Sequence, residues 1–216
     1  MLSSLIKNKD DQLKRGMIFI LSGPSGSGKT TLAQAILKDR KLNKWLGRSI
    51  SFTTRPRRRG EKEGRDYFFI SNEDFKWKLK KQKILEWTRY LGYYYGTDKD
   101  KVEQILKKGK NLILCLDIKG ARKVKKLYPQ NTITIFVMPP SLKELKKRIM
   151  ARKRETKDEI KNRLFQAQKE ITASKFYDYC LVNDKLRKAV QKLKQIILNQ
   201  LRRQKDVSSS IGESFR

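Results

Sequence analysis

One stretch near the N-terminus combines the residue types that bind a chain of phosphates. Residues 23–30 read GPSGSGKT and match the pattern G-x-x-x-x-G-K-[ST] in full. Glycines let the backbone wrap closely around an anion, and a following helix adds roughly half a positive charge at its N-terminus. The lysine would reach the β- and γ-phosphates of a nucleoside triphosphate, and the threonine hydroxyl would face Mg²⁺. The predicted triphosphate ligands are Gly23, Pro24, Ser25, Gly26, Ser27, Gly28, Lys29 and Thr30.

A second group of residues could bind another anion. Residues 51–67 read SFTTRPRRRGEKEGRDY, in which arginines stand among hydroxyl and aromatic side chains. Guanidinium groups pair with phosphate oxygens through two hydrogen bonds, so this stretch predicts a phosphate site. A solvated basic loop and an RNA-contacting patch are the alternatives. Further along, Glu86 could accept hydrogen bonds from the N1–H and amino edge of guanine, or it could be an exposed strand residue.

The composition limits the chemistry that the chain can perform. The sequence contains no histidine, which excludes histidine-dependent triads and the commonest metal ligand. Catalysis must therefore use lysine, arginine, carboxylates, hydroxyls or a metal held by oxygen. The two cysteines, Cys115 and Cys180, both stand in apolar runs and are expected to be buried thiols in a reducing cytosol.

The formal net charge of +31 has two interpretations. It could attract nucleic acid, or it could reflect lysines on solvated helix faces. The basic segments are scattered over predicted helices and form no single stripe, which favours the second interpretation and no specific nucleic-acid partner. No apolar stretch approaches the roughly 20 residues of a membrane span, so we expect a cytoplasmic protein without a membrane partner. Residues 1–15 lack the apolar core of a secretory signal and are expected to form a basic arm.

Short apolar runs alternate with helical patterns, which predicts an α/β fold with a parallel sheet flanked by helices. Buried strands are expected at residues 17–21, 112–116, 132–137 and 179–182, with helices at 30–38, 119–128, 141–150, 157–174 and 186–203. Ser141 with Glu144, and Thr156 with Glu159, have the spacing of a capping box. The polar tail, residues 206–216, is expected to be disordered.

Residues 49–96 interrupt this alternation. They are rich in aromatic residues and arginine, include pieces with period-two patterning, and contain one helix that opens at Ser71. We interpret them as a small mixed α/β lobe inserted into a core made of residues 16–48 and 97–205. A helix over residues 97–108, ended by Gly109, would lead back into the core.

The order of the motifs identifies a family resemblance. GPSGSGKT, SFTTRPRRRGEKEGRDYFF, ILEW, GYYYGT, LDIKGA, PPS and VND follow one another between about residues 17 and 204. This series resembles the guanylate kinases, which move a phosphoryl group from ATP to GMP in purine nucleotide metabolism. The resemblance implies a P-loop core, a GMP-binding lobe at 49–96 and an arginine-bearing helical lid at about 150–158. It also implies ATP and GMP as substrates, with dGMP left open, Mg²⁺ as cofactor, and a monomer or a homodimer.

The resemblance assigns roles residue by residue. The implied GMP ligands are Ser51, Arg55, Arg58, Tyr67, Glu86, Tyr95, Thr97 and Asp117, of which Glu86 and Thr97 read the guanine. The implied catalytic charges are Lys29, Arg58, Arg148, Arg152 and Arg163. Asn183 and Asp184 would lie beside the adenine, and Thr30 with Asp117 would hold Mg²⁺ directly or through water. Cys115 departs from the family, in which an acid usually stands two residues before the equivalent of Asp117.

Two other function classes remain as alternatives. Guanylate-kinase-like domains also serve as protein-binding modules without catalysis, but those typically have a degraded P-loop, whereas this one is intact. A basic RNA-binding protein is the third class, which a contiguous basic face with exposed aromatic residues would favour. Phosphoryl transfer fits the residues best, because it requires positioning and charge neutralisation more than covalent chemistry.

Overall fold

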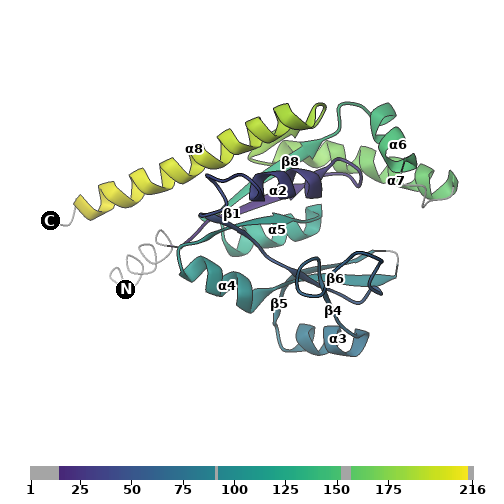
Figure 1. Cartoon of the computed structure of the whole chain (residues 1–216), viewed down its shortest axis with the longest axis horizontal. Helices are drawn as coiled ribbons and strands as arrows, with labels where there is room; N and C mark the ends of the chain where they lie inside the picture. Colours follow the sequence, from purple (N-terminus) through teal and green to yellow (C-terminus); the bar gives the residue numbers. More distant parts are fainter. Residues whose placement is uncertain (1–14, 91, 152–156, 214–216) are drawn as a thin grey trace.

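A computed structural model describes residues 15–90, 92–151 and 157–213 of the chain, which fold into an α/β core with a smaller lobe below it in Figure 1. The expected basic arm up to residue 14, the lid residues 152–156 with Arg152, and the capping residue Thr156 lie outside the described residues.

The core is built on a parallel sheet with the strand order β2-β7-β1-β8-β9 within the described residues. The strands are β1 (Ile18–Ser22), β2 (Leu46–Arg48), β7 (Asn111–Cys115), β8 (Thr132–Met138) and β9 (Tyr179–Val182). The four strands expected from apolar runs are confirmed to within a residue at each end. The edge strand β2 was not anticipated, because Leu46–Arg48 has no apolar run and owes its strand conformation to pairing with β7.

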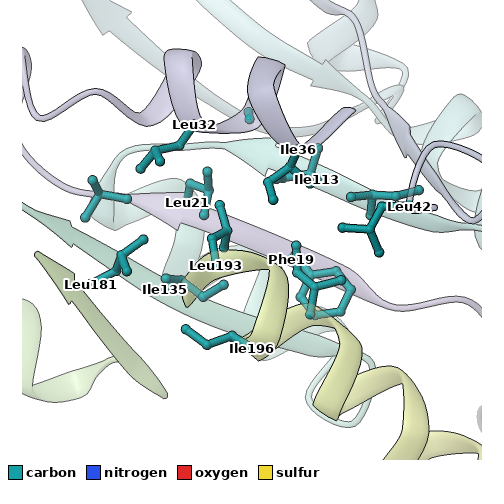
Figure 2. Packing of buried hydrophobic residues seen from close by; sticks show 14 of the residues in the cluster. Phe19, Leu21, Leu32, Ile36, Leu42, Ile113, Ile135, Leu181, Leu193 and Ile196 are labelled. Carbon is teal, nitrogen blue, oxygen red and sulfur yellow. The ribbon is translucent and has the colours of Figure 1, made fainter. Parts of the chain in front are cut away.

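Helices cover both faces of this sheet because its strands are apolar on both sides. Phe19 and Leu21 of β1 pack towards α2 (Lys29–Leu37) and α8 (Leu186–Glu213). Figure 2 shows this layer, in which Leu32 of α2 and Leu193 of α8 belong to the same cluster as Leu21 of β1. The intervening residues of β1, Ile18 and Ile20, pack instead with α4 (Lys99–Lys107) and α5 (Ile118–Leu127).

The inserted lobe has its own mixed sheet and its own small core. The strand order is β4-β3-β6-β5, with β3 (Ser51–Thr53) parallel to β4 (Phe68–Phe69) and antiparallel to β6 (Tyr93–Asp98). Strand β5 (Ile84–Tyr90) pairs with the other edge of β6, and α3 (Asn72–Lys80) packs Phe75 onto the sheet. These elements form a small mixed α/β unit with a sheet separate from the parallel sheet of the core.

The helix expected to begin at Thr97 starts two residues later, at Lys99. Thr97 instead belongs to β6, where it pairs with Ser51 of the neighbouring strand β3. Asp98 caps α4, because its side chain accepts a hydrogen bond from the Lys101 N–H. The backbone partners in the lobe thus fix the start of this helix.

Helices α6 (Leu142–Met150) and α7 (Lys157–Thr172) pack against each other through Leu145, Ile149 and Ala167. The predicted N-cap at Ser141 is confirmed, since its hydroxyl accepts from the Glu144 N–H at 3.1 Å. The last residues of the expected helix at 157–174 belong to a short 3₁₀ turn, η1 (Ala173–Phe176).

The C-terminal helix is longer than expected. We predicted an end near Arg203 and a disordered tail from residue 206, but α8 continues to Glu213. A helix anchored by buried residues such as Leu193 and Ile197 extends easily, because each further residue adds one backbone hydrogen bond. The end of the packed part is also held by Gln204, which donates to the Arg15 carbonyl at 2.7 Å. Among the described residues, no helix has the length and apolar character needed to cross a bilayer.

Candidate active site

The phosphate loop, the segment of residues 23–30 predicted to bind phosphates, joins β1 to α2 and has the backbone conformation that its glycines permit. Gly28, the N-cap of α2, has φ 96°, and a Cβ there would stand 2.3 Å from Nδ2 of Asn183. Gly23 has φ 136°, and a Cβ there would stand 2.4 Å from the Val137 carbonyl oxygen. Lys29 Nζ donates to the carbonyls of Gly23 at 2.6 Å and Pro24 at 3.0 Å, so its amine lies across the loop.

Residues predicted for the ATP side meet behind this loop. The buried Asn183 follows β9 and donates from Nδ2 to the Ser27 carbonyl at 2.8 Å. Arg148 of α6 donates from Nη1 to the Asn183 carbonyl at 3.0 Å and from Nη2 to the Asp184 carbonyl at 3.4 Å. The end of β9 therefore contacts the phosphate loop directly through Asn183, and α6 contacts it indirectly through the hydrogen bonds of Arg148.

On the side of the lobe, Glu86 is almost completely buried, with 5% of the residue exposed. Its Oε1 accepts from the Thr97 hydroxyl at 2.5 Å, which joins the two predicted guanine readers across β5 and β6. Burial raises the pKa of Glu86 to about 7, with a further contribution from the charge of Asp117, while the Thr97 hydrogen bond and Lys123 act in the opposite direction. The alternative of a solvent-exposed strand residue is wrong.

Helix α5 comes close to the Glu86 carboxylate because it carries a glycine there. A Cβ on Gly120 would stand 2.7 Å from Glu86 Oε2. The same glycine donates its N–H to Oδ1 of Asp117, the N-cap of α5, at 2.7 Å. Asp117 at the start of α5 and Glu86 of β5 therefore lie close to each other.

The arginine-rich loop contains an internal ion pair that the sequence analysis did not single out. Arg55, 7% exposed, donates from Nη2 to both carboxylate oxygens of Glu61, at 2.7 and 3.0 Å. The Arg55 guanidinium lowers the pKa of the Glu61 carboxyl, although burial acts against it. Glu61 also accepts from the Arg58 backbone N–H at 2.8 Å, so it organises the turn that carries both arginines.

A cavity of about 560 Å³ joins the phosphate loop to the lobe. The predicted residues that line it are Gly23, Ser25, Lys29, Ser51, Tyr67, Glu86, Tyr95 and Asp117. Two further predicted residues, Thr97 and Arg163, each make a hydrogen bond to a residue that lines the cavity. The Thr97 hydroxyl donates to Glu86, and Arg163 donates to the Ser25 hydroxyl at 3.2 Å. The remaining described candidates are not among the lining residues; they are Pro24, Gly26, Ser27, Gly28, Thr30, Arg55, Arg58, Arg148, Asn183 and Asp184.

The cavity also includes residues that the sequence analysis missed. Gln166 and Glu170 of α7 line it, and they follow Arg163 at intervals of three and four residues, which places all three on one helix face. Burial raises the pKa of Glu170, opposed by the charge of Lys29. The helical spacing of Gln166 and Glu170 from Arg163 was the signal by which the sequence could have identified them. Tyr90 at the end of β5 also lines the cavity, and no pattern in the sequence marked it.

The expectation of two buried thiols is wrong. Cys115 and Cys180 are both free and exposed. Cys115 ends β7 and faces the cavity at the carboxyl edge of the sheet. Cys180 lies on the edge strand β9, where the alternation of side chains turns Leu181 inwards and the thiol outwards.

A second cavity, of about 670 Å³, lies between β5 and helices α4 and α5. Its wall includes Trp87, Lys99, Glu103 and Tyr128. It shares no lining residue with the phosphate loop, so the chemistry predicted from that loop belongs to the smaller cavity.

Comparisons with known proteins agree with this geometry. Residues 15–200 match the family described as guanylate kinase. The chain is 44% identical to the guanylate kinase of Clostridium tetani (strain Massachusetts / E88), covering 86% of each protein. It is 40% identical to that of Bartonella quintana (strain Toulouse), covering 99% of this chain and 93% of the relative. The crystal structure of guanylate kinase from Anaplasma phagocytophilum superposes with a TM-score of 0.69 at 31% identity, over 87% of each chain. With its intact phosphate loop and its buried Glu86, this chain belongs to the guanylate kinase family.

Proposed function

We propose that this protein transfers the γ-phosphoryl group of ATP to GMP, giving ADP and GDP, inside the 560 Å³ cavity. One observation carries the proposal: the same cavity is lined by Lys29 of the phosphate loop and by the buried Glu86 of the lobe. A triphosphate at one end and a guanine at the other would thus share one open cavity. The intact loop favours catalysis over a protein-binding module.

ATP would bind with its phosphates on the loop of residues 23–30. Lys29 Nζ already lies over the carbonyls of Gly23 and Pro24, and a β- or γ-phosphate oxygen would compete for its protons with the stronger, charge-assisted hydrogen bond. The positive end of α2 points at the same place.

GMP would bind from the side of the lobe. The Glu86 carboxylate can accept from both N1–H and the 2-amino group of guanine, while Thr97 keeps the carboxylate in place. Ser51, Tyr67 and Tyr95 would bind the GMP phosphate from the cavity wall. Arg55 stands behind Tyr67, with its guanidinium carbon 5.6 Å from the ring centroid, and would act with Arg58 as a nearby positive charge.

The transfer itself would rest on charge neutralisation. Lys29 and Arg163, with Arg148 and Arg152 at the lid, would offset the negative charge of the two facing phosphates. No side-chain base of the histidine type is required, because the GMP phosphate oxygen is already ionised. The lobe must close on the core, since water that entered the cavity would compete as the acceptor.

The donor groups present fit a Mg²⁺ ion that arrives with ATP. Among the described residues no group of three or more acids, cysteines or histidines could hold a metal. The exposed Thr30 in the first turn of α2 and Asp117 in the cavity are the available oxygens. Mg²⁺ is typically held by one or two protein oxygens, substrate phosphates and water, so Thr30 and Asp117 would hold it directly or through water. When bound, the ion neutralises charge on the phosphates.

The enzyme would act in the cytoplasm on free nucleotides, with ATP as co-substrate and without a membrane or nucleic-acid partner. Acceptance of dGMP follows if the ribose 2′-hydroxyl makes no essential contact in the cavity.

The test is a coupled assay of ADP formation from ATP with GMP, AMP, CMP or UMP as acceptor. We expect rapid turnover with GMP alone, and near-complete loss in Lys29→Ala with GMP binding retained in calorimetry. Lys38→Ala, at the exposed end of the same helix, is the matched control and should stay active. Turnover of Lys29→Ala near the wild-type rate, or equal rates with all four acceptors, would contradict the proposal.

A further inference from the structure

The contacts of Arg163 connect three parts of the molecule. Its Nη1 donates to the Ser25 hydroxyl of the phosphate loop at 3.2 Å. Its guanidinium carbon lies 5.4 Å from the centroid of the Tyr90 ring. Arg163 belongs to α7, Ser25 to the core and Tyr90 to the last position of β5 in the lobe. A single side chain of α7 therefore contacts both the predicted phosphate loop and the lobe.

The contact between Tyr90 and the partly buried Arg163 differs in chemistry from the contact that holds the buried Arg55. Arg55 is held by the Glu61 carboxylate, which accepts its N–H groups and neutralises its charge. An aromatic ring attracts a cation through its π-face, and it neither accepts an in-plane N–H bond nor carries a negative charge. A ring contact can thus orient a guanidinium plane without placing a negative charge beside it.

We propose that Tyr90 is a positioning residue for phosphoryl transfer: its ring orients Arg163 between the two phosphates when the lobe closes on α7. The inference rests on the proposed function, because it requires Arg163 to act on those phosphates. Tyr90 itself acts through Arg163. Because the ring sits on the lobe, the orientation of Arg163 depends on the position of the GMP-binding half.

The chain offers a matched control for this contact. Tyr93 is the cross-strand partner of Tyr90 in the β5–β6 pair. The two residues have nearly equal exposure, 40% for Tyr90 and 38% for Tyr93, but Tyr93 is not among the residues that line the cavity. Replacing either tyrosine therefore removes a similar exposed ring from the same sheet, and only one replacement removes the contact with Arg163.

The experiment compares Tyr90→Leu, Tyr90→Phe and Tyr93→Leu with the wild type in the ADP-release assay, with thermal unfolding measured for each. A partly exposed cation–π contact corresponds to a change of about two- to five-fold in rate. We expect kcat to fall by that factor in Tyr90→Leu with little change in KM for GMP. Tyr90→Phe, which keeps the ring, and Tyr93→Leu should both retain the wild-type kcat.

A double-mutant cycle separates positioning from a general structural effect. In an Arg163→Lys background, which removes the planar guanidinium, Tyr90→Leu should cause no further loss of kcat. An undiminished kcat in Tyr90→Leu, an equal loss in Tyr90→Phe, or a full additional loss in the Arg163→Lys background would each overturn the inference. A wild type that forms no ADP with GMP would instead refute the proposed function, and the inference with it.

Discussion

At the scale of single residues, selectivity for guanine is predicted to depend on Glu86. Glu86→Gln keeps the shape of the side chain and an acceptor for Thr97, but it turns a donor towards the guanine edge. An unsatisfied buried polar group costs about 1–3 kcal/mol, so kcat/KM for GMP should fall by about 10- to 100-fold. Because AMP lacks both donors, its kcat/KM should fall much less, and the GMP-to-AMP ratio should narrow. Steady-state kinetics with both acceptors measures this, and an unchanged ratio would remove Glu86 from base recognition.

The same residue should give the free protein an unusual pH dependence. The pKa of Glu86 is raised from 4.5 to about 7 by burial, so between these values the folded state binds more protons than the unfolded state. The free energy of unfolding contributed by this group therefore falls as pH rises through that range, by roughly 3 kcal/mol in total. Glu86→Gln removes this dependence.

Denaturant unfolding of the nucleotide-free wild type and Glu86→Gln between about pH 5 and pH 8 measures the effect. The variant should gain stability relative to the wild type as pH rises. A constant difference across the range would show that the carboxyl is not perturbed.

At the scale of elements, the approach of α5 to β5 sets the position of Glu86, the predicted guanine reader. Gly120→Ala should strengthen α5 slightly, because alanine is the better helix former, but its Cβ would stand 2.7 Å from Glu86 Oε2. The displaced carboxylate should raise KM for GMP about 10-fold or more, with KM for ATP nearly unchanged. Gly47→Ala in β2 is the control, since its nearest contact would be an ordinary 3.8 Å. If Gly120→Ala leaves KM for GMP at the wild-type value, the close packing of α5 has no role in recognition.

At the scale of the whole molecule, the net charge of +31 should act on encounter rather than on chemistry. A positive field attracts anionic nucleotides, and salt shortens its range from about 10 Å at 0.1 M to about 3 Å at 1 M. We expect kcat/KM for GMP to fall several-fold over this range of KCl, while kcat changes little. Both are measured in one salt series with Mg²⁺ held constant. A kcat that fell in parallel with kcat/KM would show that salt disturbs the cavity itself.

The sequence by itself determined much of the fold and predicted the phosphate loop. Apolar runs mark the central strands because a parallel sheet is buried on both faces, and this signal is local. The loop pattern of residues 23–30 is equally local, since its glycines, Lys29 and the following helix are consecutive. The motif series also gave Glu86, Thr97 and Asp117 as a group.

The tertiary structure decided what depends on neighbours distant in sequence. Strand β2 exists through its pairing with β7, and the exposure of both thiols depends on where their strands end or lie in the sheet. The Arg55–Glu61 pair, the space left by Gly120 for Glu86, and the contact of Tyr90 with Arg163 join side chains through packing. A side chain's pKa and orientation depend on the groups that surround it in space, and a linear pattern does not contain those positions.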